Sequence, residues 1–267
     1  MPALVPIRFG SSPEGTPKRP LVAGITSGGG SGDPFWADVV LLMPFDGVNG
    51  STGSPGMDDI SSFAHGTANV NGAAQISTAQ FEFAPSSLLT APTDDFAFFT
   101  ASPDWNLSPA NSSPFTIEFW AYFNTFTAGR IMLGLSHVAD GTFGFWLRTS
   151  GISELSFLWS PTGAFADIQT ITSSGAGLFT GGQIPIALTK DSSGTFRFYT
   201  NGMMVGSATP ANSIIHNPGA PAILSIGGAV AAGASVDGWE DELRITKAAR
   251  YTGSSYVVAT QPFPTGP

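Results

Sequence analysis

The stretch FTIEFWAYF, residues 115 to 123, carries the pattern on which the fold prediction rests. Phe115, Ile117, Phe119, Ala121 and Phe123 occupy alternate positions in it. Successive side chains of a β-strand point to opposite faces, so this alternation places the five apolar side chains on one face of a sheet. The stretch therefore predicts a strand that contributes one face to a hydrophobic core.

Segments of the same kind recur along the chain, separated by short runs of turn residues. They are residues 37–45, 130–136, 142–149, 154–160, 183–191, 194–202, 203–209 and 222–228. They are rich in aromatic and β-branched residues, and Asn201-Gly202 supplies two residues that tolerate positive φ in a tight hairpin. No apolar pattern of helical period extends beyond about two turns. About twelve to fourteen antiparallel strands without helices predict an all-β, two-sheet jelly-roll sandwich.

The chain divides near residue 33. Residues 1–33 show no periodicity; they carry a proline every few residues and then the run SGGGSG at residues 27–32. Proline keeps a backbone extended, and a glycine and serine run makes a flexible hinge. No local element would bury the apolar residues of this arm, which are Leu4, Val5, Ile7, Phe9, Leu21, Val22 and Ile25. We expect an arm over residues 1–33 that binds a partner protein, and one jelly-roll domain over residues 34–267; the alternative is a tail without a partner.

Composition narrows the classes of partner and site. The 267 residues include 10 Lys and Arg against 19 Asp and Glu, and no Cys. An acidic surface repels phosphates, so nucleic acid is not an expected partner. Without Cys there are neither disulfides nor thiolate metal sites. No apolar run approaches the length of a membrane span, and no apolar leader follows Met1, so we expect neither membrane insertion nor a secretory signal.

Four phrases, taken in order, resemble a known family. They are LLMPFDG (41–47), FTIEFWAYF (115–123), IALTKDSSGTFRFYTNGMMVGSA (186–208) and GWEDELRITKAARYT (238–252). Together they resemble the laminin-G-like domains of the concanavalin A-like lectin/glucanase superfamily, in the form found in virion proteins of tailed bacteriophages. The resemblance covers about residues 38 to 264 and implies a jelly roll of two curved antiparallel sheets, without implying one function. SSFAH at residues 61–65 only approximates the family's D-S-S-G-H turn.

The segment DGWEDELRITKAARYT, residues 237 to 252, contains three consecutive acids, Glu240, Asp241 and Glu242. A regular strand would point Asp241 inward or toward the edge of the sandwich and leave Glu240 and Glu242 in solvent. A buried carboxylate needs N–H donors, a cation or a proton. We expect Asp241 to accept hydrogen bonds from a nearby turn, such as the one around Asp46. The alternative, suggested by the laminin-G-like resemblance, is a calcium ion shared by Asp46 and Asp241.

The sequence favours a protein without enzymatic activity. Glycosidases of the superfamily that this chain resembles carry acids at positions i, i+2 and i+4 of one strand, so that all three share a face. The three acids at residues 240–242 are consecutive and would alternate between the two faces. His65, His137 and His216 are far apart, lie outside any metal-binding motif, and are expected in loops or at the surface. We therefore expect no catalytic residue and, apart from the calcium alternative, no cofactor.

Two functions from different classes fit these features. The first is a structural protein located in the virion, a capsid decoration or tail-associated protein. Its arm would bind other virion proteins, and copies of the chain could meet in a symmetric assembly. The second is an adhesion module that binds a glycan or receptor on the host surface. Sugar rings stack on exposed aromatic side chains, for which the candidates are Trp105, Trp146, Trp159 and Tyr199.

Overall fold

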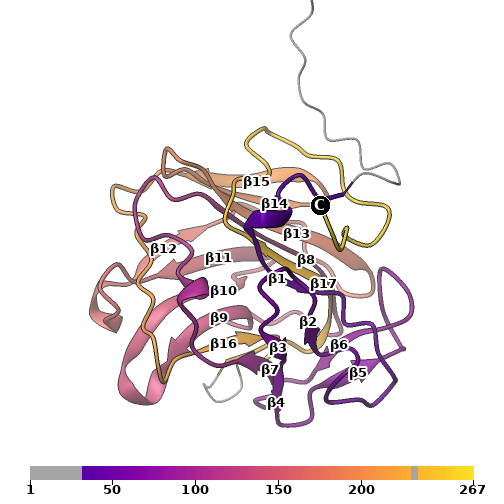
Figure 1. The fold of residues 1–267 in the computed structure, drawn as a ribbon. Helices are drawn as coiled ribbons and strands as arrows, with labels where there is room; N and C mark the ends of the chain where they lie inside the picture. The colour runs from indigo at the N-terminus through magenta and orange to yellow at the C-terminus, as the bar shows by residue number, and fades with distance from the viewer. Residues whose placement is uncertain (1–31, 230–233) are drawn as a thin grey trace, which may run out of the picture.

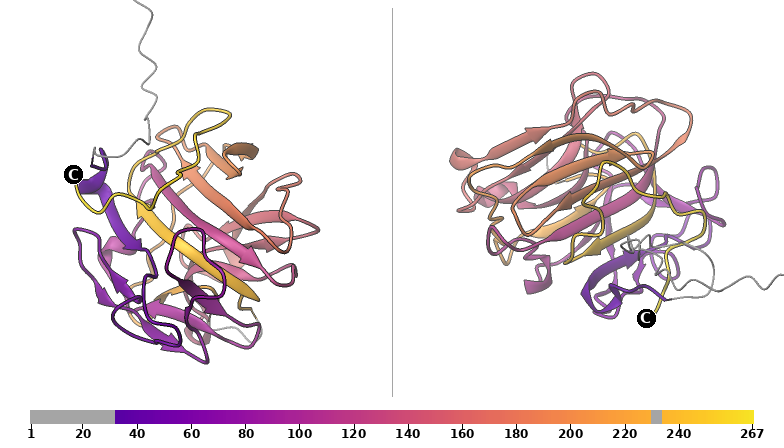
Figure 2. Two further views of the ribbon diagram at one scale, coloured as in Figure 1. Left: turned by 90° about the vertical axis from the view of Figure 1, so that its right-hand side faces the viewer. Right: turned by 90° about the horizontal axis from the view of Figure 1, so that it is seen from above.

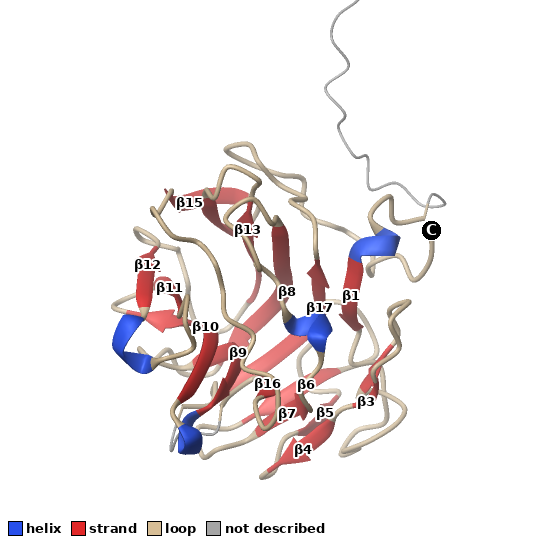
Figure 3. Cartoon of the chain, turned by 60° about the vertical axis from the view of Figure 1, so that its left-hand side comes forward, coloured by secondary structure: helices blue, strands red, loops and turns tan. Residues whose placement is uncertain are grey.

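The computed structural model describes residues 32–229 and 234–267. The seven apolar residues predicted to anchor the arm lie outside the described residues, so the arm and the division of the chain at residue 33 stay predictions. Within the described ranges the chain forms strands and short 3₁₀ helices, coloured red and blue in Figure 3. None of these helices is long and apolar enough to cross a membrane.

The described residues form seventeen strands, which confirms the all-β fold class predicted from the sequence (Figure 1). The number is higher than the twelve to fourteen expected because several of the strands are only two to four residues long. The strands are β1 (Val39–Met43), β2 (Asp58–Asp59), β3 (Gly66–Thr67), β4 (Asn69–Asn71), β5 (Gln75–Ser77), β6 (Ser87–Thr90), β7 (Phe96–Phe99), β8 (Phe115–Phe123), β9 (Ile131–His137), β10 (Thr142–Ser150), β11 (Glu154–Trp159), β12 (Gln169–Thr172), β13 (Gln183–Lys190), β14 (Phe196–Thr200), β15 (Met203–Ala208), β16 (Ile223–Ile226) and β17 (Gly238–Thr246). The 3₁₀ helices are η1 (Trp36–Asp38), η2 (Pro103–Trp105), η3 (Val138–Asp140) and η4 (Phe165–Asp167).

The strands form two large antiparallel sheets and one small hairpin. The eight-stranded sheet has the order β15-β14-β13-β8-β17-β6-β5, with β1 also paired to β17. The seven-stranded sheet has the order β12-β11-β10-β9-β16-β7-β4, and β2 pairs with β3. The predicted hairpin between β14 and β15 is present, with φ of 50° at Asn201 and 74° at Gly202. Two sheets face to face around a core are the architecture expected of a jelly roll.

The core lies between the two large sheets and uses the face that the sequence pattern predicted. All five alternate apolar residues of FTIEFWAYF belong to one core cluster. Phe145 and Leu147 of β10 and Phe157 of β11 contribute to it from the seven-stranded sheet. Because period-2 alternation puts apolar side chains of both sheets on facing surfaces, the sandwich closes without helices.

Strand β17 runs through the middle of the eight-stranded sheet, as the yellow arrow in the left view of Figure 2 shows. On one edge it pairs with β8 along most of its length. On the other edge, residues 238–240 pair with β6 and residues 243–246 pair with β1. The acidic segment therefore lies where one neighbouring strand gives way to another.

The C-terminal segment after β17 crosses the outer face of the eight-stranded sheet and passes beside β13, β14 and β15 (yellow in Figure 1). The N–H of Tyr256 donates to the carbonyl of Gly202 at 2.8 Å, and the hydroxyl of Tyr199 donates to the carbonyl of Gly253 at 2.7 Å. Farther along, Phe263 packs on Trp120 of β8. This face is therefore covered, although it is not part of the main core.

Candidate functional site

The acidic segment is buried, contrary to part of the sequence prediction. Glu240, Asp241 and Glu242 are each at most 1% exposed, so the expected solvent exposure of Glu240 and Glu242 is wrong. Two features explain this. Strand β17 is irregular at these residues, and other segments of the chain cover its outer face.

The irregularity is a β-bulge. Asp241 and Arg244 lie opposite residues 120 and 118 of β8, so Glu242 and Leu243 together oppose a single residue. Glu242 has a φ of 51°, in the left-handed region that a bulge residue can adopt. The extra residue shifts the alternation by one position. Asp241 therefore points to the outer face, rather than inward or toward the sandwich edge as predicted, and Glu240 points to the core.

Asp241 and Glu242 each hold a neighbouring segment on the sheet. Oδ2 of Asp241 accepts hydrogen bonds from the N–H groups of Glu82 (2.8 Å) and Phe83 (3.0 Å). Oε2 of Glu242 accepts one from the N–H of Phe263 at 2.9 Å. Burial raises the pKa of Asp241 and of Glu242 to about 7, although these hydrogen bonds favour the charged forms. Their surroundings are those of structural carboxyl groups.

Glu240 lies between the two sheets. It pairs with Leu88 of β6 and Ala121 of β8, which are both core residues. Neither of its carboxyl oxygens has a hydrogen-bond partner among the described residues. Burial raises the pKa of Glu240 well above its ordinary value, which favours the protonated form. An unpartnered acid inside the core cannot reach a ligand at the surface.

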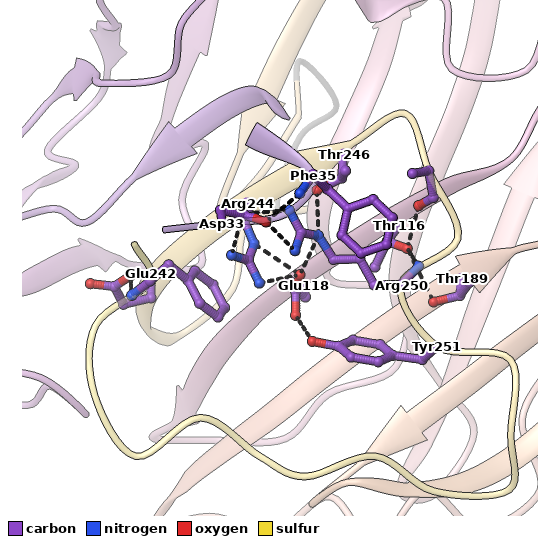
Figure 4. Close-up of polar contacts among 12 residues, drawn as sticks. Asp33, Phe35, Thr116, Glu118, Thr189, Glu242, Arg244, Thr246, Arg250 and Tyr251 are labelled. Carbon is purple, nitrogen blue, oxygen red and sulfur yellow. Dashed lines mark hydrogen bonds and ion pairs between the residues drawn. The ribbon is translucent and has the colours of Figure 1, made fainter. Parts of the chain in front are cut away.

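A second group of charges, which we call the clasp, lies on the outer face of the same sheet (Figure 4). It consists of Asp33, Glu118, Arg244, Arg250 and Tyr251. Arg244 donates to Glu118 at 2.8 Å and to Asp33 at 3.0 Å. Arg250 donates to both oxygens of Asp33, at 2.6 and 3.0 Å, and the Tyr251 hydroxyl donates to Glu118 at 2.6 Å. Two carboxylates thus meet two guanidinium groups, and the charges balance.

The clasp joins Asp33, three residues before η1, to strands β8 and β17 and to the C-terminal segment. The side chains of its two arginines and two carboxylates are at most 6% exposed. The rings of Phe263 and Phe35 stack on the guanidinium groups of Arg244 and Arg250, with 3.7 and 5.0 Å to the ring centroids. The phrase RITKAARYT, which carries much of the family resemblance, therefore supplies a structural network. The sequence placed Glu118 on the non-core face of its strand but gave no sign of what covers it.

The predicted calcium ligands, Asp46 and Asp241, lie near each other. Burial is the main cause of the raised pKa of Asp241, and the charges of Glu242 and then of Asp46 raise it further. We expected the turn around Asp46 to donate hydrogen bonds to Asp241, but the donors are the N–H groups of Glu82 and Phe83. In that turn the N–H of Gly47 donates to the hydroxyl of Ser86 at 2.8 Å. No group of three or more His, Asp or Glu side chains in the described ranges is arranged to hold a metal. Calcium stays a prediction.

His65 is less isolated than expected for a loop histidine. Its Nδ1 lies 2.8 Å from Asp59 Oδ2, and its Nε2 lies 3.1 Å from Asp104 Oδ2. The ring packs on Trp105 with 4.2 Å between centroids. Asp59 also accepts the N–H of Leu42 at 3.0 Å, so the imperfect SSFAH turn is tied to β1 by a buried carboxylate. This arrangement connects the β2–β3 hairpin to η2.

Of the four aromatic residues predicted to stack on a sugar, Trp146 alone keeps an exposed surface. Trp105 is 1% exposed, and Trp159 and Tyr199 are 0% exposed. Trp146 is half-buried. A sugar ring needs an open aromatic face, so burial removes the other three as candidates.

Trp146 lies on the outer face of the seven-stranded sheet. Its neighbours on β10, Phe145 and Leu147, point into the core, so the indole points away from it. A row of paired residues crosses the sheet through Trp146: Asn69, Phe98, Ser225, Gly134, Trp146, Leu158 and Thr170. The row combines two half-buried aromatic side chains with buried small residues between them, and exposed polar residues stand at both ends. The accessible part of the row therefore consists of the two aromatic side chains and the polar ends.

The indole of Trp146 is held in one orientation. Its Nε1 donates to the hydroxyl of Ser136 at 3.1 Å. Phe143 and Phe165 contact it edge-on, with centroids 4.9 and 6.3 Å away. A Cβ on Gly134 would come within 2.7 Å of the indole Cδ1, so the ring lies directly over a residue that has no side chain. A fixed ring reduces the entropy that binding must overcome.

Several solved structures share the fold. They include the binding domain of Paraclostridial Mosquitocidal Protein 1, with a TM-score of 0.56 and 16% identity over 81% of this chain and 50% of that chain. Another is the botulinum neurotoxin serotype D ligand binding domain in complex with N-acetylneuraminic acid, with a TM-score of 0.56 and 10% identity over 81% of this chain and 49% of that chain. A third is Trypanosoma rangeli sialidase, with a TM-score of 0.51 and 14% identity over 85% of this chain and 32% of that chain. The chain spans about half the length of these binding domains, and identities this low show the fold alone.

Sequence comparison places the chain in a family. No curated protein matches it. A laminin G family model, described as concanavalin A-like lectin/glucanases superfamily, matches residues 97–252. This match covers more than half of the sequence and extends from β7 past the end of β17, through both large sheets and the arginines of the clasp. The chain therefore belongs to the concanavalin A-like lectin/glucanases superfamily.

Proposed function

We propose that this protein is a carbohydrate-binding module without enzymatic activity, and that its ligand stacks on Trp146. The observation that carries the proposal is the orientation of this indole on the outer face of the seven-stranded sheet, fixed by Ser136, Phe143 and Phe165. A flat, fixed aromatic ring with polar neighbours suits the apolar face of a sugar. The similarity in fold to a domain solved with N-acetylneuraminic acid supports the same class of ligand.

The surroundings of the acidic residues support a role without catalysis. Glycoside hydrolysis requires two carboxyl groups on either side of the scissile bond. Glu240 points into the core, and Asp241 and Glu242 are covered by segments that they bind through main-chain N–H groups. None of the three is open to a substrate.

A glycan array probed with the labelled protein tests this proposal. The Trp146→Ala variant should lose binding, because the stacking surface is gone. Phe179→Ala is the matched control, since it removes a 49%-exposed aromatic ring from a loop outside the proposed site. Retention of binding by Trp146→Ala, with its melting temperature unchanged, would show that the ligand binds elsewhere.

A second candidate function, a structural protein of a virus particle, is favoured by the position of Asp33. This residue is the last one of the predicted arm, and both clasp arginines bind its side chain. Its N–H also donates to the carbonyl of Gly266 at 2.8 Å. The point where the arm would leave the domain is thereby tied to the central strand β17. A capsid decoration or tail-associated protein needs such a firm connection between anchor and domain.

The two functions are compatible in one molecule. Asp33 lies on the outer face of the eight-stranded sheet, whereas Trp146 lies on the outer face of the seven-stranded sheet. The outer faces of a sandwich point in opposite directions. A domain held by its arm on a particle could therefore present Trp146 outward, toward a host-surface glycan.

Deletion of residues 1–31, with Asp33 retained, tests the second function. The truncated protein should keep its melting temperature and its glycan binding, but should no longer associate with particles. A truncated protein that occupies particles at the level of the full chain would show that the anchor lies on the domain.

A further inference from the structure

We propose that the ligand of the Trp146 face is a saccharide that carries a carboxylate, and that Arg148 binds this group. The inference rests on the proposed function and names the ligand class of the same site. It depends on the position of Arg148, on its lack of a partner, and on the charge of the rest of the domain.

Arg148 and Trp146 share the outer face of β10. They are two residues apart on a regular part of the β10–β11 ladder, where Trp146 pairs with Leu158 and Arg148 pairs with Ser156. Side chains at this spacing point the same way and start about 7 Å apart. Ser156 bonds through its hydroxyl to the hydroxyl of Thr172 at 3.1 Å, so the residues across from Arg148 in the sheet carry hydroxyl groups. A sugar ring on the indole would lie within reach of the Arg148 side chain.

The guanidinium group of Arg148 has no partner within the described part of the chain. It forms no ion pair, its Nε is buried without an acceptor, and its two terminal nitrogens donate to no described residue. Glu154, on the same face of β11, makes no ion pair with it either. By contrast, Arg197, Arg244 and Arg250 each donate to a carboxylate at 3.0 Å or less.

A partly buried arginine without an acidic partner lowers the stability of the fold, so its presence at this position suggests a function. Burial lowers the pKa of Arg148, with no acid to offset the effect, yet an arginine stays charged at neutral pH. The chain carries 19 acidic residues against 10 basic ones. The Trp146 face thus combines a stacking platform with an unpaired positive charge in an otherwise acidic protein.

A carboxylate-bearing sugar complements both features. In uronic and sialic acids the carboxylate is attached to a ring carbon, so a ring stacked on Trp146 can direct it to Arg148. Guanidinium groups bind carboxylates through two parallel hydrogen bonds, which are stronger than hydrogen bonds between neutral groups. A neutral sugar would leave the charge unpaired, and an extended polyanion would be repelled by the surrounding acids.

The test compares matched pairs of immobilised saccharides, sialyllactose with lactose and a glucuronate-containing oligosaccharide with its glucose counterpart. The wild-type protein should bind at least one acidic member about tenfold or more tightly than its neutral partner. Arg148→Gln should bring the acidic member down to the affinity of the neutral one, and Arg148→Lys should restore part of the difference. Arg197→Gln removes the same charge from the other sheet and should leave the preference intact.

The outcomes separate this inference from the proposed function. If wild-type protein binds acidic and neutral members equally, or if Arg148→Gln keeps the preference, the inference is overturned while carbohydrate binding stands. If Trp146→Ala binds as well as wild type, or if no member of either pair binds, the proposed site fails and the inference fails with it. Melting temperatures of all variants exclude loss of fold as the cause.

Discussion

Replacing Asp241 with Asn should remove a large part of the pH dependence of stability. Burial raises the pKa of Asp241 to about 7, whereas an aspartate in the unfolded chain titrates near 3.8. Between these values the folded protein keeps a proton that the unfolded chain has released. The contribution to the free energy of unfolding is therefore full below about pH 4 and is lost as the pH rises through about 7. Roughly three pH units at about 1.4 kcal/mol each correspond to ~4 kcal/mol.

Calorimetric melting curves between pH 4.5 and pH 8 measure this effect. For a domain of this size about 1 kcal/mol shifts the melting temperature by roughly 2–4 °C, so the wild-type value should fall by about 10 °C more than that of Asp241→Asn. Asn keeps the acceptor for Glu82 and Phe83 but does not titrate. Asp191→Asn is a control, because the pKa of Asp191 is shifted in the opposite direction to that of Asp241. Burial raises the pKa of Asp191, but hydrogen bonds from Arg197 and main-chain N–H groups outweigh it and lower the pKa. This variant should lose a similar amount of stability throughout this pH range, and the loss should shrink only as the pH falls below about 3.8. Parallel pH profiles for wild type and Asp241→Asn would refute the reasoning.

Three further substitutions, the first with a control, test the clasp, the core and one turn. Arg244→Met should reduce the free energy of unfolding in urea by about 3–5 kcal/mol, because it leaves Arg250 as the only cation for the two buried carboxylates of the clasp. Arg197→Met, at a more exposed pair, should cost about 1 kcal/mol or less. Glu240→Met should raise the free energy of unfolding at pH 8 by about 1–3 kcal/mol, since an apolar side chain replaces an unpartnered acid in the core. A lower free energy of unfolding would mean that the carboxyl group has a partner, such as a buried water. Asn201→Ala should lower the melting temperature, at a cost of about 1 kcal/mol, because its φ of 50° is strained for alanine.

The sequence by itself determined the features that depend on local pattern. The alternation in FTIEFWAYF predicted β8 with its correct bounds and its core face. The Asn201-Gly202 dipeptide predicted the hairpin, since few other residue pairs accept two positive φ angles in succession. The ordered strand phrases predicted the family and the sandwich. The strand and the hairpin follow from steric preferences that act within a few residues, whereas the family follows from the order of several such phrases along the chain.

Tertiary structure alone decided which faces are covered and where the alternation shifts. In β17 the neighbour changes from β6 to β1 and a bulge forms, so Asp241 and Glu240 exchange the faces that a regular strand would give them. The clasp exists because the C-terminal segment returns over a face that the pattern marks only as polar. The same limit applies to the aromatic residues. Trp146 and Trp159 occupy similar strand phrases, yet one faces outward and the other lies in the core. Strand periodicity tells which side chains share a face, but only the packing of distant segments decides whether that face meets protein or water.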